Sequence, residues 1–216
     1  MKKVVLSLII VAGLSFATVS CKKSAEAKDA EAVAEATAEA VTLNVNTTES
    51  TIEWKGSKVI TGSHNGTVAL SSGEISVKDG VVEAGSFVID MNSITVLDIE
   101  DEEKKGWLEG HLKGAGEDNA DHFFNVSEFP EGKFEITSVS EGNIEGNLTL
   151  KGITKNVKFP ATITVSDNDV TIIAEPFNID RTLWGVNYSN ESMTDVAKDN
   201  IISNNIELKL NVKASK

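Results

Sequence analysis

The chain has 216 residues, of which 33 are Asp or Glu and 20 are Lys or Arg, so its formal net charge at pH 7 is -13. This length is enough for one domain of moderate size with its own apolar core, and a single cysteine excludes an internal disulfide framework and a cysteine zinc site. The acidic balance argues against nucleic acid as a partner and against electrostatic docking on anionic lipid.

The first 20 residues have the pattern of a bacterial secretion signal. Lys2 and Lys3 form a positive start, and the apolar run that follows is too short to span a bilayer. Small or apolar residues come directly before the sole cysteine, Cys21, as in a loose lipobox. We therefore expect a lipoprotein signal peptide over residues 1–20, a lipidated Cys21 and a periplasmic or outer-membrane lipoprotein of the bacterial envelope. The alternative is a secreted protein with a free cysteine.

The segment over residues 21–42 is rich in Ala and Glu and has hardly any large apolar residue. Because it has little to bury, we predict a solvated tether that carries the anchor. From about residue 43, Thr, Val, Ile, Asn and Gly become frequent and alternating runs begin. Residues 43–216 are therefore predicted to form one domain.

Most of this domain has the period of two that is typical of β-strands. The alternating runs are residues 52–55, 66–77, 86–91, 134–136, 144–150, 157–165, 170–179 and 206–212. Short polar turns join many of them, which predicts an antiparallel all-β domain of about eight strands. One short helix is expected over residues 98–112, with Trp107, Leu108 and Leu112 as its docking residues.

The strand pattern is compatible with a sandwich or a barrel, and we favour a barrel because closure removes exposed edge strands. The apolar side of the strands carries both large and small residues, and the small ones leave room inside, which predicts an elongated apolar lumen suited to a chain-like hydrocarbon. A fully packed core is the alternative. The residues expected to line the tunnel are Trp54, Val68, Phe87, Ile89, Met91, Phe134, Leu148, Phe159, Ile163, Phe177 and Ile179.

The sole arginine, Arg181, lies in an apolar and aromatic stretch. By strand parity its side chain is on the same face as those of Phe177 and Ile179 and points toward the lumen, near the end of its strand. One hypothesis places Arg181, Trp184 and Tyr188 at the tunnel rim, where the guanidinium is held by a carboxylate or meets a lipid head group. The alternative is a structural role, with the guanidinium bound to backbone carbonyls or to an acidic loop residue.

Catalytic and metal-binding patterns are weak in this sequence. His64, His111 and His122 lie on separate segments without zinc-ligand spacing, so no metal is expected. Asp90 and Asp180 are the candidate acid and base of an enzyme, but parity places both opposite the apolar face. No phosphate-binding loop is present, and we expect no cofactor. An envelope enzyme that uses His and Asp residues stays an alternative function.

A set of short motifs runs in order through residues 43–214: Ile52-Glu-Trp54, Gly62-Ser-His64-Asn-Gly66, Gly85-Ser-Phe87-Val-Ile-Asp90, Gly110-His111-Leu-Lys113, His122-Phe-Phe124, Gly146-Asn-Leu-Thr-Leu-Lys151-Gly152 and Ile179-Asp-Arg181-Thr-Leu-Trp184-Gly185. This set resembles the YceI family of periplasmic polyisoprenoid-binding proteins. The resemblance implies an extended, lipocalin-like barrel whose tunnel holds a long isoprenoid or another amphiphilic lipid, with no implied reaction. The chain departs from the family pattern at Gly114–Asp121 and at Asn200–Asn205.

These observations predict a protein that binds and sequesters or carries a polyisoprenoid, a quinone-like lipid or a fatty amphiphile in an apolar tunnel. Its expected partners are that lipid and, through the N-terminal anchor, a membrane. A homodimer stays open. A structural lipoprotein with a filled barrel is the third alternative.

Overall fold

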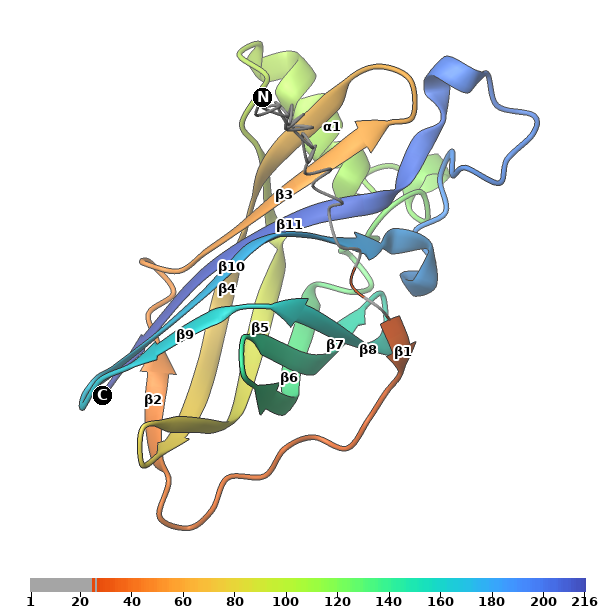
Figure 1. The fold of residues 1–216 in the computed structure, drawn as a ribbon. Coiled ribbons are helices and arrows are strands. Elements are labelled where there is room, and N and C mark those ends of the chain that lie inside the picture. The colour runs from red at the N-terminus through yellow and green to blue at the C-terminus, as the bar shows by residue number, and fades with distance from the viewer. Residues whose placement is uncertain (1–24, 26) are drawn as a thin grey trace, which may run out of the picture.

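The computed structural model describes residue 25 and residues 27–216, so the predicted signal peptide and Cys21 lie outside the described residues. The prediction of an all-β antiparallel barrel with one short helix is confirmed: Figure 1 shows one strongly curved sheet with helix α1 at one end. The sheet contains eleven strands, because two short ones (β1 and β2) add to the predicted set and the run predicted as one strand over residues 157–165 is divided into β8 and β9. The strands are β1 (Ala27–Asp29), β2 (Val41–Val45), β3 (Thr51–Lys58), β4 (Ser63–Lys78), β5 (Val81–Val96), β6 (Glu131–Ser140), β7 (Asn143–Leu150), β8 (Ile153–Pro160), β9 (Thr162–Val165), β10 (Asp169–Asp180) and β11 (Ile202–Ser215).

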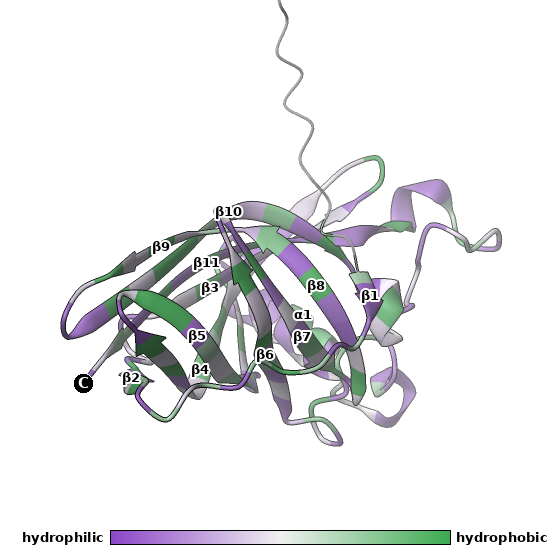
Figure 2. Cartoon of the chain, turned by 60° about the horizontal axis from the view of Figure 1, so that its bottom comes forward, coloured by the Kyte–Doolittle hydropathy of each residue, from purple (hydrophilic) through white to green (hydrophobic). Residues whose placement is uncertain are grey.

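Neighbouring strands pair antiparallel in the order β1-β8-β7-β6-β5-β4-β2-β11-β10-β9, and β3 pairs with both β4 and β11. The two longest strands, β4 and β5, have 16 residues each, and their register shifts at three places. Such bulges bend and twist a strand pair, so these long strands can wrap around the interior. Figure 2 shows hydrophobic and hydrophilic bands that alternate along the strands, as expected when one face of the sheet is buried.

The barrel has a seam between β8 and β10, which are not joined by a hydrogen-bonded ladder within residues 27–216. The N-terminal segment covers this seam. Strand β1 pairs with β8, and the Ala25 N–H donates to the Asn178 carbonyl of β10 at 2.8 Å. Inside the seam the rings of Phe159 and Phe177 stack with their centroids 4.5 Å apart.

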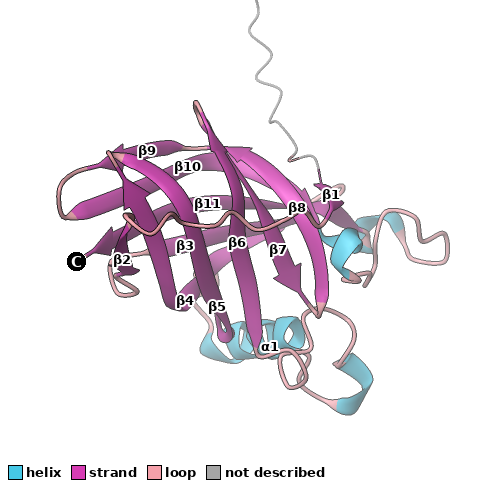
Figure 3. Cartoon of the chain, turned by 90° about the horizontal axis from the view of Figure 1, so that it is seen from below, coloured by secondary structure: helices cyan, strands magenta, loops and turns pink. Residues whose placement is uncertain are grey.

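The segment between β1 and β2 crosses the outside of the sheet in front of β6 and β5 (Figure 3). The Asn147 side chain bonds both main-chain groups of Glu31, and the Ala34 N–H donates to the Ile136 carbonyl. The prediction of a solvated tether is therefore corrected for the described residues after Ala25. Composition misled here because main-chain groups, which every residue carries, make most of these contacts.

Helix α1 (Glu102–Lys113) begins at its cap, Asp101, whose side chain accepts from the N–H groups of Glu103 and Lys104. It starts later than predicted because the Asp98 carboxylate is bound to the Asn65 N–H and to His64. Trp107 does not dock on the barrel, since it is 70% exposed. None of the helices in the described part of the chain is long and apolar enough to cross a bilayer.

Three short 3-10 helices complete the fold: η1 (Glu117–Asn119), η2 (Arg181–Trp184) and η3 (Lys198–Asn200). Two glycines let aromatic rings lie flat on the sheet. A Cβ on Gly66 would fall 2.7 Å from the Trp54 ring, and one on Gly146 would fall 2.3 Å from the Phe134 ring. Both rings are thereby held at the barrel interior, where they contribute to the site described next.

Candidate functional site

The barrel interior contains two adjoining apolar cavities. We call the first the helix-side cavity, because Leu112 of α1 and the loop residues Phe123 and Phe124 help to line it. The second is the phenylalanine cavity, lined by Phe87, Phe134, Phe159 and Phe177 among others. Their volumes are about 130 and 90 Å³. Five residues line both cavities, and we call them the junction residues: Ile52, Ile89, Leu148, Ile179 and Leu208.

The phenylalanine cavity is built by one ring from each of four strands. Phe87 of β5 lies 6.1 Å from Phe134 of β6, measured between ring centroids, and Phe134 lies 5.7 Å from Phe159 of β8. The stack of Phe159 on Phe177 of β10 completes the series. Such offset and tilted ring pairs are favourable arrangements, so the four rings form a continuous apolar wall.

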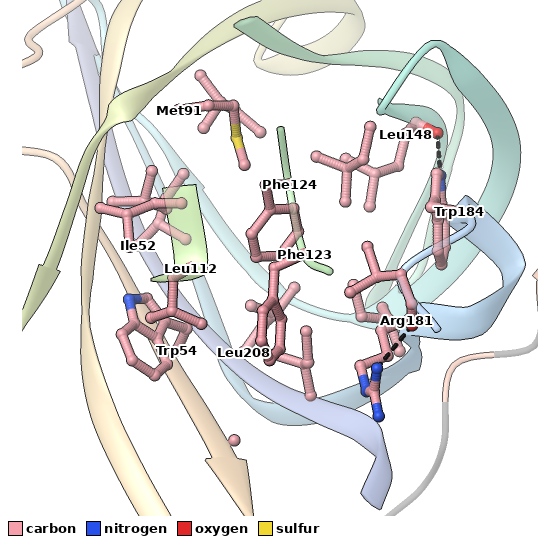
Figure 4. A pocket seen from close by; sticks show the side chains of 18 of the residues that line it. Ile52, Trp54, Met91, Leu112, Phe123, Phe124, Leu148, Arg181, Trp184 and Leu208 are labelled. Atoms are coloured by element: carbon pink, nitrogen blue, oxygen red, sulfur yellow. Dashed lines mark hydrogen bonds between the residues drawn. The ribbon is translucent and has the colours of Figure 1, made fainter. Parts of the chain in front are cut away.

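In the helix-side cavity, Phe123 and Phe124 lie between Ile52 and Trp54 on one side and Leu148 and Trp184 on the other (Figure 4). Both tryptophans have their N–H groups occupied by the main chain. Trp54 donates to the Thr67 carbonyl at 3.2 Å, and Trp184 donates to the Leu148 carbonyl at 2.9 Å. The indole rings therefore present only apolar surface to the cavity.

Arg181 also lines the helix-side cavity, but its polar atoms are occupied by backbone carbonyls. Nε donates to Ser203 at 3.0 Å, Nη1 to Val186 at 2.6 Å, and Nη2 to Tyr188 and Ile202 at 3.0 and 3.2 Å. The side chain is 2% exposed, and burial lowers its pKa. The contacts of Arg181 are therefore those that the structural alternative expects, a guanidinium bound to backbone carbonyls.

The other two predicted rim residues have different positions. Trp184 is fully buried and lines the helix-side cavity rather than an open rim. Tyr188 lines neither cavity and stacks on His122, with ring centroids 4.2 Å apart. The physical reason is the 3-10 turn η2, which ends at Gly185 with a left-handed φ of 72° and reverses the chain after Trp184.

Ten of the eleven predicted tunnel residues line one or both cavities, and Ile163 is the exception. Ile163 lies on the short strand β9, which is the last strand of the sheet and pairs only with β10. Sequence reasoning missed Ile52 and Leu208, although their parity with Trp54 and Leu210 points inward. It also missed Phe123 and Phe124, because a loop has no regular alternation from which the direction of its side chains could be predicted.

The candidate acid and base residues serve as local hydrogen-bond acceptors. Asp180 accepts from the Thr182 N–H and hydroxyl at 2.9 and 2.6 Å, so it caps η2. Asp90 accepts from the Asn92 N–H at 3.0 Å. Neither carboxylate lines a cavity. The arrangement of these two residues therefore gives no support to a paired acid and base.

His111, His122, Phe123 and Tyr188 form a group that we call the histidine cluster. His111 Nε2 and His122 Nδ1 are 2.8 Å apart, so one of these nitrogens donates to the other. The rings of Phe123 and Tyr188 meet the His111 ring edge-on at 5.1 and 5.0 Å. The cluster thus ties α1 to the loop that carries Phe123 and Phe124. Across residue 25 and residues 27–216, no three His, Cys, Asp or Glu side chains come together as a group that could hold a metal ion.

The histidine cluster predicts a loss of stability in mild acid. Burial, with a smaller contribution from His122, lowers the pKa of His111. A histidine whose folded-state pKa lies below its unfolded value of about 6.5 binds fewer protons when folded, so stability is lost as the pH falls through that value. We expect the urea unfolding midpoint to fall between about pH 7.5 and about pH 5.5. In His111→Phe, which keeps a ring but cannot be protonated, this fall should be smaller. An equal fall in the original protein and in this variant would contradict the assignment.

Comparison with known proteins agrees with this architecture. A model of the YceI-like domain matches residues 43–214. UPF0312 proteins of Yersinia pestis (strain Pestoides F) and Yersinia pseudotuberculosis serotype I (strain IP32953) are each 31% identical over 96 residues, which is 43% of this chain and 43% of theirs. The match therefore spans less than half the length of these curated relatives.

Two solved structures share the fold. A polyisoprenoid binding domain from Saccharophagus degradans, implicated in plant cell wall breakdown, has a TM-score of 0.59 and 15% identity, covering 80% of this chain and 97% of that one. Burkholderia cenocepacia BcnA has a TM-score of 0.57 and 17% identity, covering 79% of this chain and 99% of its own. Because the family model spans most of the chain and the fold agrees, this protein belongs to the YceI-like family.

Proposed function

We propose that this protein binds a long hydrophobic ligand, such as a polyisoprenoid, a quinone-like lipid or a fatty amphiphile, and carries or sequesters it in the bacterial envelope. The observation that carries the proposal is the pair of apolar cavities, which meet at five shared residues inside one barrel. Two compartments joined in this way suit a chain-like molecule better than a compact one. The similarity to a polyisoprenoid binding domain from Saccharophagus degradans supports the same ligand class.

The chemistry of the lining favours binding by apolar contact. Each methylene moved from water into such a site contributes about 0.8 kcal/mol, so a few isoprene units exceed the cost of association. The filled-barrel alternative is less well supported, because both compartments have open space. The enzyme alternative is also less well supported, because Asp90 and Asp180 accept local hydrogen bonds away from the cavities.

The proposal is tested by organic extraction of the full chain, purified from its native envelope, followed by mass spectrometry. We expect a long-chain lipid near one equivalent per protein. A protein without lipid that also takes up no polyprenol from vesicles would overturn the carrier function.

We further propose that the protein is anchored through a lipidated Cys21. Four residue steps separate Cys21 from Ala25, which is held on the barrel through Asn178. An extended chain of that length reaches about 14 Å, so the anchor would keep the barrel close to the membrane surface. Cys21→Ser should move the protein from the membrane fraction to the periplasmic fraction. Unchanged fractionation would contradict the anchor.

A further inference from the structure

We infer that the N-terminal segment is a removable cover of the barrel seam. When it is displaced, the gap between β8 and β10 becomes the entrance through which a chain-like ligand reaches the phenylalanine cavity. We call residues 27–37, which begin with β1, the strap. The inference rests on the proposed function, because it gives the ligand of that function a route into the barrel.

The seam opens directly onto the phenylalanine cavity. Phe159 of β8 and Phe177 of β10 stand on its two sides, and both line that cavity. On the side that faces the seam, β10 pairs with β9 only as far as Ile173. Beyond Ile173 the described chain gives β10 no ladder partner on that side. The gap is therefore a side opening of the cavity, which side chains and the strap close.

The outer closure of this opening is made by small side chains. Ala27 of the strap pairs with Val157 of β8, and Ala25 bonds Asn178 of β10. Both alanines pack against the core from outside. Displacement of the strap would leave the stacked rings of β8 and β10 between the cavity and solvent. Rotation of one ring about its side-chain torsions would then open the gap without breaking a backbone hydrogen bond.

Polar contacts hold the strap on the outer face of the sheet, which it crosses one strand at a time (Figure 3). The contacts are, in chain order, Asp29 with Lys155 of β8, Glu31 with Asn147 of β7, Ala34 with Ile136 of β6 and Thr37 with Glu83 of β5. The one large apolar side chain of the strap, Val33, is 42% exposed. Segments held by exposed hydrogen bonds with little apolar burial open at a small fraction of the global unfolding free energy.

The sheet surface beneath the strap is also polar. Asn147 and Asn156 are buried although they point away from the barrel interior, and the Asn156 amide donates to Asn147 at 3.2 Å and to Thr137 at 2.9 Å. Water can bond these amides once the strap has left, so its release leaves no unpaired polar group in an apolar setting. A surface of this kind suits a cover that leaves and returns better than a fixed layer of the core.

A disulfide between the strap and β8 tests the cover. Asp29 and Lys155 face each other across β1 and β8, and residues directly opposite in an antiparallel pair lie within reach of a disulfide. In a chain with Cys21→Ser, the pair Asp29→Cys and Lys155→Cys should therefore lock the strap in place. The matched control replaces the ion pair of Glu53 and Lys209, which face each other across β3 and β11, in the same way.

Uptake is followed by stopped-flow tryptophan fluorescence on the delipidated protein, with geranylgeraniol carried in phosphatidylcholine vesicles. Trp54 and Trp184 line the adjoining helix-side cavity, so their fluorescence reports binding. We expect the locked protein to take up the alcohol at least about 10-fold more slowly than the same protein reduced with dithiothreitol, and to bind the same final amount. The control disulfide should leave the rate unchanged.

Asn147→Ala tests the cover in the opposite direction. It removes the side chain that bonds both main-chain groups of Glu31, so uptake should be about 3- to 10-fold faster. In the locked protein the same substitution should leave the rate unchanged, because the disulfide still holds β1 over the seam. Faster uptake in both backgrounds would mean that the substitution loosens the barrel itself, which contradicts a removable cover.

Equal uptake rates in the locked and reduced proteins would overturn the inference, as would the same slowing by the control disulfide. In either case the ligand would still bind, so the carrier function would stand and only the entrance would fail. If the alcohol binds to none of the proteins, the original included, the proposed function falls together with this inference.

Discussion

Arg181→Lys should lower the free energy of unfolding by about 3 kcal/mol and the melting temperature by roughly 6–12 °C, while lipid bound per folded molecule stays unchanged. The guanidinium holds four carbonyls that belong to two segments, the stretch after η2 and the start of β11. A lysine ammonium has three donors at a single point, so at least one buried carbonyl loses its partner. Thermal melting and quantification of extracted lipid measure the two effects.

The exposed Lys198 of η3 provides a control, since Lys198→Ala should change stability by no more than about 0.5 kcal/mol. Arg181→Gln is a second test. A neutral amide has only two donors, so this variant should lower the free energy of unfolding at least as much as Arg181→Lys does. The structural role of Arg181 would be refuted by a variant that melts like the original protein but has lost its lipid.

Leu208→Trp should reduce the affinity for a long ligand by about 10²- to 10³-fold and leave a short ligand bound. Leu208 is a junction residue on β11, paired with Trp54 of β3 and Phe177 of β10. A larger side chain there would separate the two cavities, so a long chain would lose the contacts of one compartment. Losing about four or five buried methylenes corresponds to roughly 3–4 kcal/mol, which gives this fold-change.

A matched control is Leu183→Trp in η2, which should leave binding of both ligands unchanged. The Leu183 side chain is 39% exposed and lines neither cavity. Overpacking at Leu208 costs about 1–3 kcal/mol, so thermal melting should accompany the binding curves to show that the variant is folded. Equal losses for long and short ligands, or no loss for either, would show that the cavities do not act as one tunnel.

The sequence determined the strands and the direction of most inward side chains. Alternation is a local property, because successive Cβ atoms of a strand point to opposite faces. Phe87 and Ile89 therefore follow from the pattern of β5 alone, as do Phe177 and Ile179 from that of β10. Parity also places Arg181 correctly at the cavity wall. Capping by Asp101 could have been read from its position before an acidic first turn.

Only the tertiary structure decided what Arg181 does. Its acceptors are main-chain carbonyls, two of which lie more than 20 residues away on β11. Every residue carries the same carbonyl, so no sequence pattern marks these partners. The same reason explains the N-terminal segment, where an Ala- and Glu-rich composition predicted a solvated tether and main-chain bonds hold residues 27–29 and Ala34 on the barrel. The positions of Phe123 and Phe124 likewise depend on α1 and the histidine cluster. A loop has no regular alternation, so contacts with distant segments set the direction of its side chains.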